Sequence, residues 1–346
     1  MGKAVDSKRP VAPEGFERGS IVHAPVDGQA DGRETWEGEV KRGLFWAAFG
    51  GMIAFAAPNI GSVIAAYGIC LACFEREGSL LWKALLACLG AGALTAALVD
   101  LTQVPLVILT CVATIAVALL VMRNKATSGC LCALALALAA ATGGVEALYA
   151  WIGGTTLPQA ITDLLTVSGE MLSKGANISA QVGVDRAVAL ARTYWPMAYL
   201  SGAAVRVALA LFGARLALRK RGVVFEKSAL MEFDAPLWVC AAFVVGMAAS
   251  MSAPLFPEWS YWIKFFGENV LTAARIALSI QGIAVGLWYA RQRGVGPFMR
   301  GMLVALMVWI EVSFVVMSVL GLVDALLANF RSLERRRWGF ATRSHE

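Results

Sequence analysis

A series of long apolar segments, separated by short turns that carry basic residues, fills the chain from residue 44 onward. A helix of about 20 apolar residues crosses the hydrocarbon core of a bilayer, and most of these segments reach that length. Together they hold more apolar surface than a soluble domain of this size can bury. The pattern therefore predicts an all-α fold, a polytopic bundle in the membrane. The segments are residues 44–74, 80–99, 104–122, 130–152, 194–218, 236–256, 261–289 and 302–327.

The first apolar segment is too long for a single span and contains Pro58. Proline lacks the backbone N–H of a helix interior and disfavours helix at the residue before it. We therefore expect two short helices, at residues 44–57 and 59–74, which brings the count to about eight or nine transmembrane helices. Because hydrophobic residues make up 58% of the chain and charged residues 16%, a soluble enzyme, a disulfide scaffold and a disordered protein are excluded.

Three regions differ in composition. Residues 1–43 are hydrophilic and lack the apolar core of a signal peptide, which predicts a disordered cytoplasmic tail. Residues 44–331 form the predicted membrane domain, and residues 332–346 form a basic C-terminal tail. Within the membrane domain, residues 153–191 place apolar side chains among polar ones. This insertion is either an amphipathic helix on the outer membrane surface or capping the bundle, or a solvated loop.

Basic residues tend to remain on the cytoplasmic side of a membrane, so the turns predict a topology. With a cytoplasmic N-terminus in a bacterial cytoplasmic membrane, residues 153–191 and 257–260 fall outside. The last apolar segment conflicts with this scheme, because one crossing would expel the arginines that follow it. Either the segment folds back near Glu311, or the tail is an exception. The turns expected inside are residues 76–83, 123–125, 219–227 and 291–300.

Charged residues inside spans cost at least about 2.5–3.5 kcal/mol each, so they are the best candidates for a site. Lys264, Glu268, Arg275 and Ser279 share one helix face, with Asn269 and Gln281 beside it. They form either a polar wall of a ligand cavity or an internal set of ion pairs. Arg206 and Arg275 can each neutralise Glu146 or Glu311, and the sequence assigns no pairs. The candidate ligand-binding residues are Arg206, Glu268, Asn269, Arg275, Gln281, Glu146 and Glu311.

Several kinds of chemistry lack their residues. The two histidines, His23 and His345, lie near the ends of the chain, and no nucleotide-binding, zinc-protease or serine-hydrolase motif is present. We expect no catalytic activity, no cofactor and no metal site. The basic clusters lie beside apolar spans, which favours contact with anionic lipid over nucleic acid.

The second half of the chain resembles the YybS-like family, bacterial membrane proteins of unknown function. The likeness includes an aromatic-x-x-Pro motif at Phe233 to Pro236, an Asn before Gln-Gly, and a Leu-Gly-x-x-Asp motif near the end. It covers residues 194–331, and the long hydrophilic start departs from the family pattern. The residues that match family motifs are Pro236, Asn269, Gln281, Gly282, Gly321, Asp324 and Arg331.

The resemblance implies a more distant likeness in fold to the S-components of energy-coupling factor transporters. S-components bind small solutes and dock on an ATPase module through helix faces made of small residues. Ala47 and Gly51 would be such a face here. The first hypothesis is therefore a transport-related component that binds a small solute and has no ATPase of its own. The alternative is a membrane scaffold or regulatory protein, whose tails and loop 219–235 bind membrane or cytoplasmic partner proteins.

Overall fold

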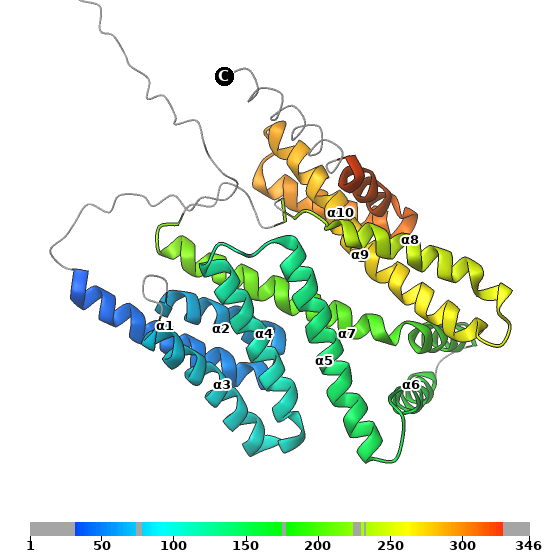
Figure 1. Cartoon of the computed structure of the whole chain (residues 1–346), viewed down its shortest axis with the longest axis horizontal. Helices are drawn as coiled ribbons and strands as arrows, with labels where there is room; N and C mark the ends of the chain where they lie inside the picture. The colour runs from blue at the N-terminus through cyan, green and yellow to red at the C-terminus, as the bar shows by residue number, and fades with distance from the viewer. Residues whose placement is uncertain (1–31, 74–77, 175–177, 224–229, 232, 328–346) are drawn as a thin grey trace, which may run out of the picture.

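A computed structural model describes residues 32–73, 78–174, 178–223, 230–231 and 233–327. Every regular element in that part of the chain is a helix (Figure 1), which confirms the predicted all-α class. The longer helices are α1 (Gly32–Ala56), α2 (Pro58–Cys73), α3 (Ser79–Val99), α4 (Val104–Met122), α5 (Ser128–Ile152), α6 (Leu157–Ser173), α7 (Ile178–Lys220), α8 (Leu237–Ser252), α9 (Ser260–Gln292) and α10 (Pro297–Phe314). Two short 3-10 helices and a last helix, Val316–Leu327, complete the described elements.

Seven helices within the described ranges are long and apolar enough to cross a membrane, by length and composition. The predicted count of about eight or nine also included the helices expected at residues 44–57 and 59–74, which correspond to the second half of α1 and to α2. Neither is among the seven, and α2 and Val316–Leu327 are shorter apolar helices. Few residues of α3, α5 and α10 are buried inside the bundle, and large apolar side chains such as Trp82, Leu136 and Trp309 are exposed. Exposed apolar surface on this scale belongs in lipid, so the chain is a polytopic membrane protein that contacts lipid.

The predicted break at Pro58 is confirmed. Helix α1 ends at Ala56, and α2 begins at Pro58 and runs back along it. A side chain on Gly50 or on Gly68 would clash with the backbone of the facing helix. Gly51 contacts α3 in the same way, and Ala47 is fully buried against α2. The small residues that we expected to form a docking face are therefore used inside the bundle, where they allow close helix packing.

Helix α1 begins at Gly32, earlier than the expected start of the membrane domain at residue 44. The charged residues just before the apolar segment are part of this helix. Val40 is buried, and Glu39 forms an ion pair with Arg221 at the end of α7, with 2.6 Å between Oε2 and Nη1. These contacts extend the helix into the region that composition alone assigned to a tail. Residues 1–31 and 328–346, which hold the rest of both predicted tails and Arg331, lie outside the described residues.

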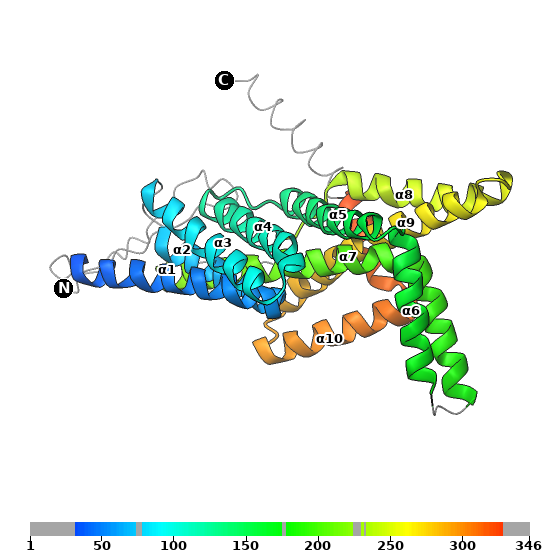
Figure 2. The ribbon, with the colours of Figure 1, turned by 90° about the horizontal axis from the view of Figure 1, so that it is seen from below.

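The predicted insertion at residues 153–191 consists of helix α6 and the first part of α7, rather than a loop. In Figure 2 this pair stands across the direction of the other helices. Arg192 of α7 donates a hydrogen bond to Thr166 of α6 at 2.7 Å. Leu164, Met171 and Leu172 remain exposed on α6. An exposed apolar face on a helix that crosses the bundle direction fits an element at the membrane surface.

The last apolar segment contains a break. Helix α10 ends at Phe314, and Val315 has a positive φ of 60°, which L-residues with branched side chains rarely adopt. The helix Val316–Leu327 follows and packs against α9, because Gly282 and Gly321 let the two backbones meet. The hypothesis that this segment folds back near Glu311 agrees with the position of the break.

Candidate functional site

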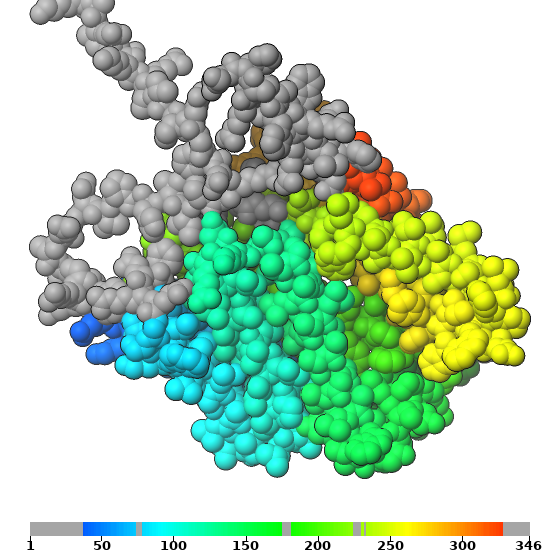
Figure 3. All heavy atoms as spheres, in the orientation of Figure 1, coloured from blue at the N-terminus to red at the C-terminus, as the bar shows by residue number. Residues whose placement is uncertain are grey.

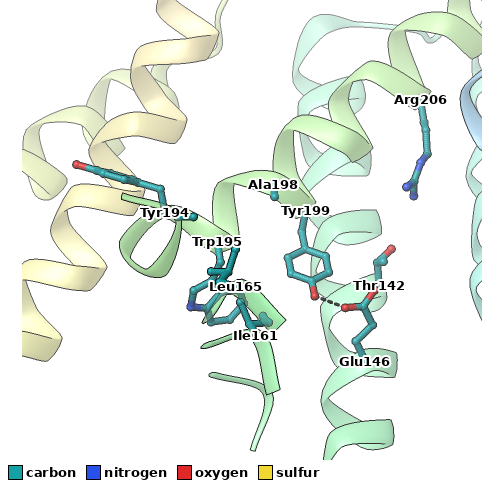
Figure 4. A pocket seen from close by; sticks show the side chains of 10 residues that line it. Thr142, Glu146, Ile161, Leu165, Tyr194, Trp195, Ala198, Tyr199 and Arg206 are labelled. Atoms are coloured by element: carbon teal, nitrogen blue, oxygen red, sulfur yellow. Dashed lines mark hydrogen bonds between the residues drawn. The ribbon is translucent and has the colours of Figure 1, made fainter. Parts of the chain in front are cut away.

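A pocket of about 430 Å³ lies between α5, α6 and α7. Its volume is within the range of small-molecule sites in proteins. Figure 3 shows α5 and α9 separated at the surface, with α7 visible between them. The pocket is lined by Thr142, Glu146, Ile161, Leu165, Ala191, Tyr194, Trp195, Ala198, Tyr199 and Arg206 (Figure 4).

A kink in α7 shapes one wall of the pocket. Pro196 cannot donate the backbone hydrogen bond of a helix interior, and Tyr194 just before it has non-helical angles of φ −105° and ψ 15°. The side-chain amide of Asn269 on α9 donates to the carbonyl oxygen of Thr193 at 3.0 Å. Asn269 thus satisfies a carbonyl at the interrupted part of the helix. The Tyr194 hydroxyl donates to Glu268 at 3.3 Å and points away from Glu146 in Figure 4.

The polar end of the pocket contains one carboxylate and one guanidinium. The Tyr199 hydroxyl donates a hydrogen bond to Glu146 of α5 (Figure 4). Arg206 lies about two turns after Tyr199 on α7, so both side chains leave the same helix face. The Arg206 Nε atom is buried without a hydrogen-bond partner. Arg206 forms no ion pair within 4.0 Å among the residues that the structure describes, although Glu146 is near enough to attract it.

The opposite end of the pocket is apolar. Ile161 and Leu165 come from α6 and face Trp195 of α7 (Figure 4). Trp195 packs edge-on against Tyr199, with 5.9 Å between the ring centroids. Tyr199 therefore lies between the apolar end and the polar end. The pocket offers apolar contact area and two opposite charges at separate places.

Arg275 and Glu311, two other predicted ligand-binding residues, are bonded to each other. The Arg275 Nε atom donates to Glu311 Oε1 at 2.9 Å, and its Nη2 atom donates to the Glu311 carbonyl oxygen at 3.1 Å. The other carboxylate oxygen accepts the backbone N–H of Ser318 at 3.0 Å, at the start of the last helix. A carboxylate at that position stabilises a helix N-terminus. This geometry favours the interpretation as an internal ion-pair set over that of a cavity wall.

Five of the residues that match family motifs gather around the middle of α9, away from the pocket, whereas Asn269 lies at the kink of α7. Gln281 accepts the backbone N–H of Ala235 at 3.0 Å and donates to Asp324 at 2.6 Å. It thereby joins the turn before α8 to the last helix. Pro236 is the residue that precedes α8, and Gly282 and Gly321 bring α9 and the last helix together. These motif residues hold three segments in place, and we call this set the α9 joint.

Sequence reasoning found the two charged residues of the pocket, Glu146 and Arg206, but missed Trp195 and Tyr199. The seven-residue separation of Tyr199 from Arg206 was the available signal, since it places both on one helix face. Ile161 and Leu165 gave no signal, because they reach the pocket only through the fold of α6 on α7. Across the described ranges, no three His, Cys, Asp or Glu side chains come together in a way that could hold a metal ion.

Comparison with known proteins yields one family. A family model described as "Predicted membrane protein (DUF2232)" matches residues 48–325. No curated protein and no solved structure matches the chain. The matched residues include the pocket, the Arg275–Glu311 pair and the α9 joint.

Proposed function

We propose, for a chain that belongs to the DUF2232 family of predicted membrane proteins, a role as a membrane component that binds a small solute. The binding site in this proposal is the pocket between α5, α6 and α7. The chain itself performs no catalysis. It presents the solute to a transport process that another component drives.

Arg206 is the observation that carries the proposal. A guanidinium within a membrane span has a high free-energy cost, and bundles usually offset that cost with a partner. Arg275 has its partner in Glu311, whereas Arg206 lines the pocket and its buried Nε atom has no hydrogen-bond partner. An arginine that lines a pocket and has no ion-pair partner in the protein is suited to bind a ligand that carries a negative charge. Glu146 and Tyr199 add further polar groups at the same place.

The transport context comes from the resemblance to YybS-like proteins, and through them to S-components. The sequence has no P-loop, so an ATPase module would be a separate partner. We place the chain in a bacterial cytoplasmic membrane with its N-terminus in the cytoplasm, since the basic turns then face inward. The surface for an ATPase module would differ from Ala47 and Gly51, because both pack inside the bundle.

Native mass spectrometry of the full chain, extracted from its own membrane in mild detergent, tests this role. We expect a small-molecule adduct on the wild-type protein that is lost in Arg206→Gln. Arg300→Gln is the matched control, because Arg300 also has a buried, unpartnered Nε but lies on α10, outside the pocket. An adduct that both variants retain would contradict the assignment to the pocket. Co-purified proteins with no solute would favour the scaffold hypothesis instead.

A further inference from the structure

The two ends of the pocket restrict the chemistry of its ligand, if the proposed solute-binding role holds. The polar end has one guanidinium, Arg206, and one carboxylate, Glu146, on opposite helices. The apolar end is formed by Trp195, Ile161 and Leu165. A ligand that fits both ends has a small polar head and an apolar body.

Arg206 selects a carboxylate in that head. Its planar guanidinium has five N–H donors and matches a carboxylate with two parallel hydrogen bonds. Arg206 lines the pocket and forms no hydrogen bond or ion pair with the residues that the structure describes, so its guanidinium has donors left for a ligand. A hydroxyl or carbonyl would satisfy fewer of these donors and would leave the charge uncompensated.

Glu146 selects a cation in the same head. Tyr199 donates a hydrogen bond to one oxygen of the carboxylate and thereby holds it in position. An ionised carboxylate accepts hydrogen bonds at both oxygens, so it can also accept those of an ammonium group. Thr142, the neighbouring hydroxyl, donates to the carbonyl oxygen of Leu138 at 2.7 Å and does not compete for Glu146.

The charge balance decides among the possible head groups. Arg206 and Glu146 sum to zero and do not pair directly. A ligand that is only an anion would leave Glu146 without a cation, and one that is only a cation would leave Arg206 without an anion. Within a membrane, either choice carries a large desolvation cost. A zwitterion pairs both charges at once.

We infer that the pocket binds a zwitterionic α-amino acid with an apolar side chain, whose carboxylate meets Arg206 and whose ammonium group meets Glu146. The side chain of the ligand lies against Trp195, Ile161 and Leu165. Tyr199, between the two ends, contacts the α-carbon region of the ligand.

Isothermal titration calorimetry on the solubilised full chain tests the inference with L-leucine, L-methionine and L-phenylalanine as probes. We expect wild-type protein to bind at least one of them. For leucine, the matched analogues are 4-methylpentanoate, which lacks the amine, and 3-methylbutylamine, which lacks the carboxylate. Each analogue should bind about 10- to 100-fold more weakly than leucine, because it loses one charge-assisted contact.

The variants separate the two contacts. In Glu146→Gln the advantage of leucine over 4-methylpentanoate should disappear, and in Arg206→Gln its advantage over 3-methylbutylamine should disappear. Equal binding of leucine and 4-methylpentanoate to the wild-type protein would overturn the inference. So would a wild-type protein that binds no probe yet retains another molecule lost in Arg206→Gln, an outcome that leaves the proposed function intact. A protein with neither bound probe nor retained molecule would overturn both.

Discussion

Arg206 and Arg275 are two arginines in apolar helices with opposite surroundings. Arg275 donates two hydrogen bonds to Glu311, one to the carboxylate and one to the backbone. Arg206 lines a pocket, and its own buried Nε atom has no hydrogen-bond partner. The same residue type thus pairs within the bundle at one position and lines a pocket without an ion-pair partner among the described residues at the other.

Removal of Glu311 should destabilise the protein without a direct effect on the pocket. Glu311→Ala leaves the Arg275 guanidinium and the Ser318 N–H without their acceptor. We expect a loss of about 3 kcal/mol, the lower end for a broken buried pair, because Arg275 is partly exposed. Thermal unfolding in detergent measures the loss. Glu258→Ala, at an exposed turn residue, is the control and should unfold like the wild type; equal stability of Glu311→Ala would contradict the structural role.

Gln281 should also stabilise the protein, because it is the hydrogen-bond partner of two other segments. Its side chain accepts from Ala235 and donates to Asp324, so Gln281→Ala leaves a buried N–H unsatisfied and removes one hydrogen bond. The expected loss is about 2 kcal/mol in the free energy of unfolding. Gln281→Glu retains the acceptor but places a second carboxylate beside Asp324, so it should also be less stable than the wild type. An unchanged unfolding temperature in both variants would show that the α9 joint contributes little.

For single residues, the sequence indicated which charged side chains have a high free-energy cost within a membrane span, but it could not assign their partners. Charge and span position singled out Glu146, Arg206, Arg275 and Glu311. The assignment of Glu311 to Arg275 depends on the break at Val315, which turns the chain so that Ser318 also reaches the carboxylate. A positive φ at a valine has no local sequence signal, because it is imposed by the packing on both sides.

Close helix contacts at glycine define the elements around α9. A side chain on Gly321 would clash with the Leu278 carbonyl oxygen, and one on Gly282 would clash with that of Met317. Gly321→Ala should therefore displace the last helix and lower the unfolding temperature clearly. Gly90→Ala is the control on α3, where a Cβ meets no atom within 4 Å. It should be neutral or more stable by about 0.5–1 kcal/mol; a Gly321→Ala protein as stable as Gly90→Ala would contradict the packing.

The kink in α7 places Trp195 at the pocket. Removal of the kink should therefore weaken binding of the solute and leave the protein equally or more stable. Pro196→Ala restores a backbone donor within the helix, where proline costs about 3 kcal/mol relative to alanine. We expect equal or higher thermal stability but weaker retention of the solute, because a straighter helix moves Trp195 and Tyr199. Native mass spectrometry and thermal unfolding on one sample give both quantities. Full retention of the solute by Pro196→Ala would show that the kink does not shape the site.

Most elements followed from hydrophobic runs and proline positions, as the break between α1 and α2 shows. One helix boundary and the pocket did not. The start of α1 at Gly32 depends on a tertiary ion pair between Glu39 and Arg221, which local composition does not contain. The pocket itself depends on how α6 folds on α7, and an amphipathic pattern alone leaves the partner of such a helix undefined.

At the scale of the whole molecule, the helix ends alternate between two sides. Arg221, just after α7, donates a hydrogen bond to the Leu71 carbonyl oxygen near the end of α2, and the Asp234 N–H donates to Ser128 at the start of α5, so these turns lie on one side. On the other side, Tyr149 donates to the Thr102 carbonyl oxygen at 2.7 Å. This arrangement places the basic turns on one side, as the proposed orientation with a cytoplasmic N-terminus predicts.

Cysteine accessibility in intact cells tests that topology. Lys125 and Glu258 are exposed at turns that the predicted topology places on opposite sides of the membrane. Glu258→Cys should react with a membrane-impermeant maleimide from outside, and Lys125→Cys should react only after the cells are opened. The wild-type protein supplies the baseline, because Cys130 is exposed near the Lys125 turn. The reverse labelling pattern would contradict a cytoplasmic N-terminus.

The central claim is that the pocket between α5, α6 and α7 binds a small solute through Arg206 and Glu146. A cryo-electron microscopy structure of the protein, extracted from its own membrane without added ligand, tests this claim most directly. The account predicts non-protein density in the pocket that touches both the guanidinium and the carboxylate, with Tyr199 still bonded to Glu146. A collapsed pocket in which Arg206 pairs directly with Glu146, with density for lipid only on the outer surface, would contradict it.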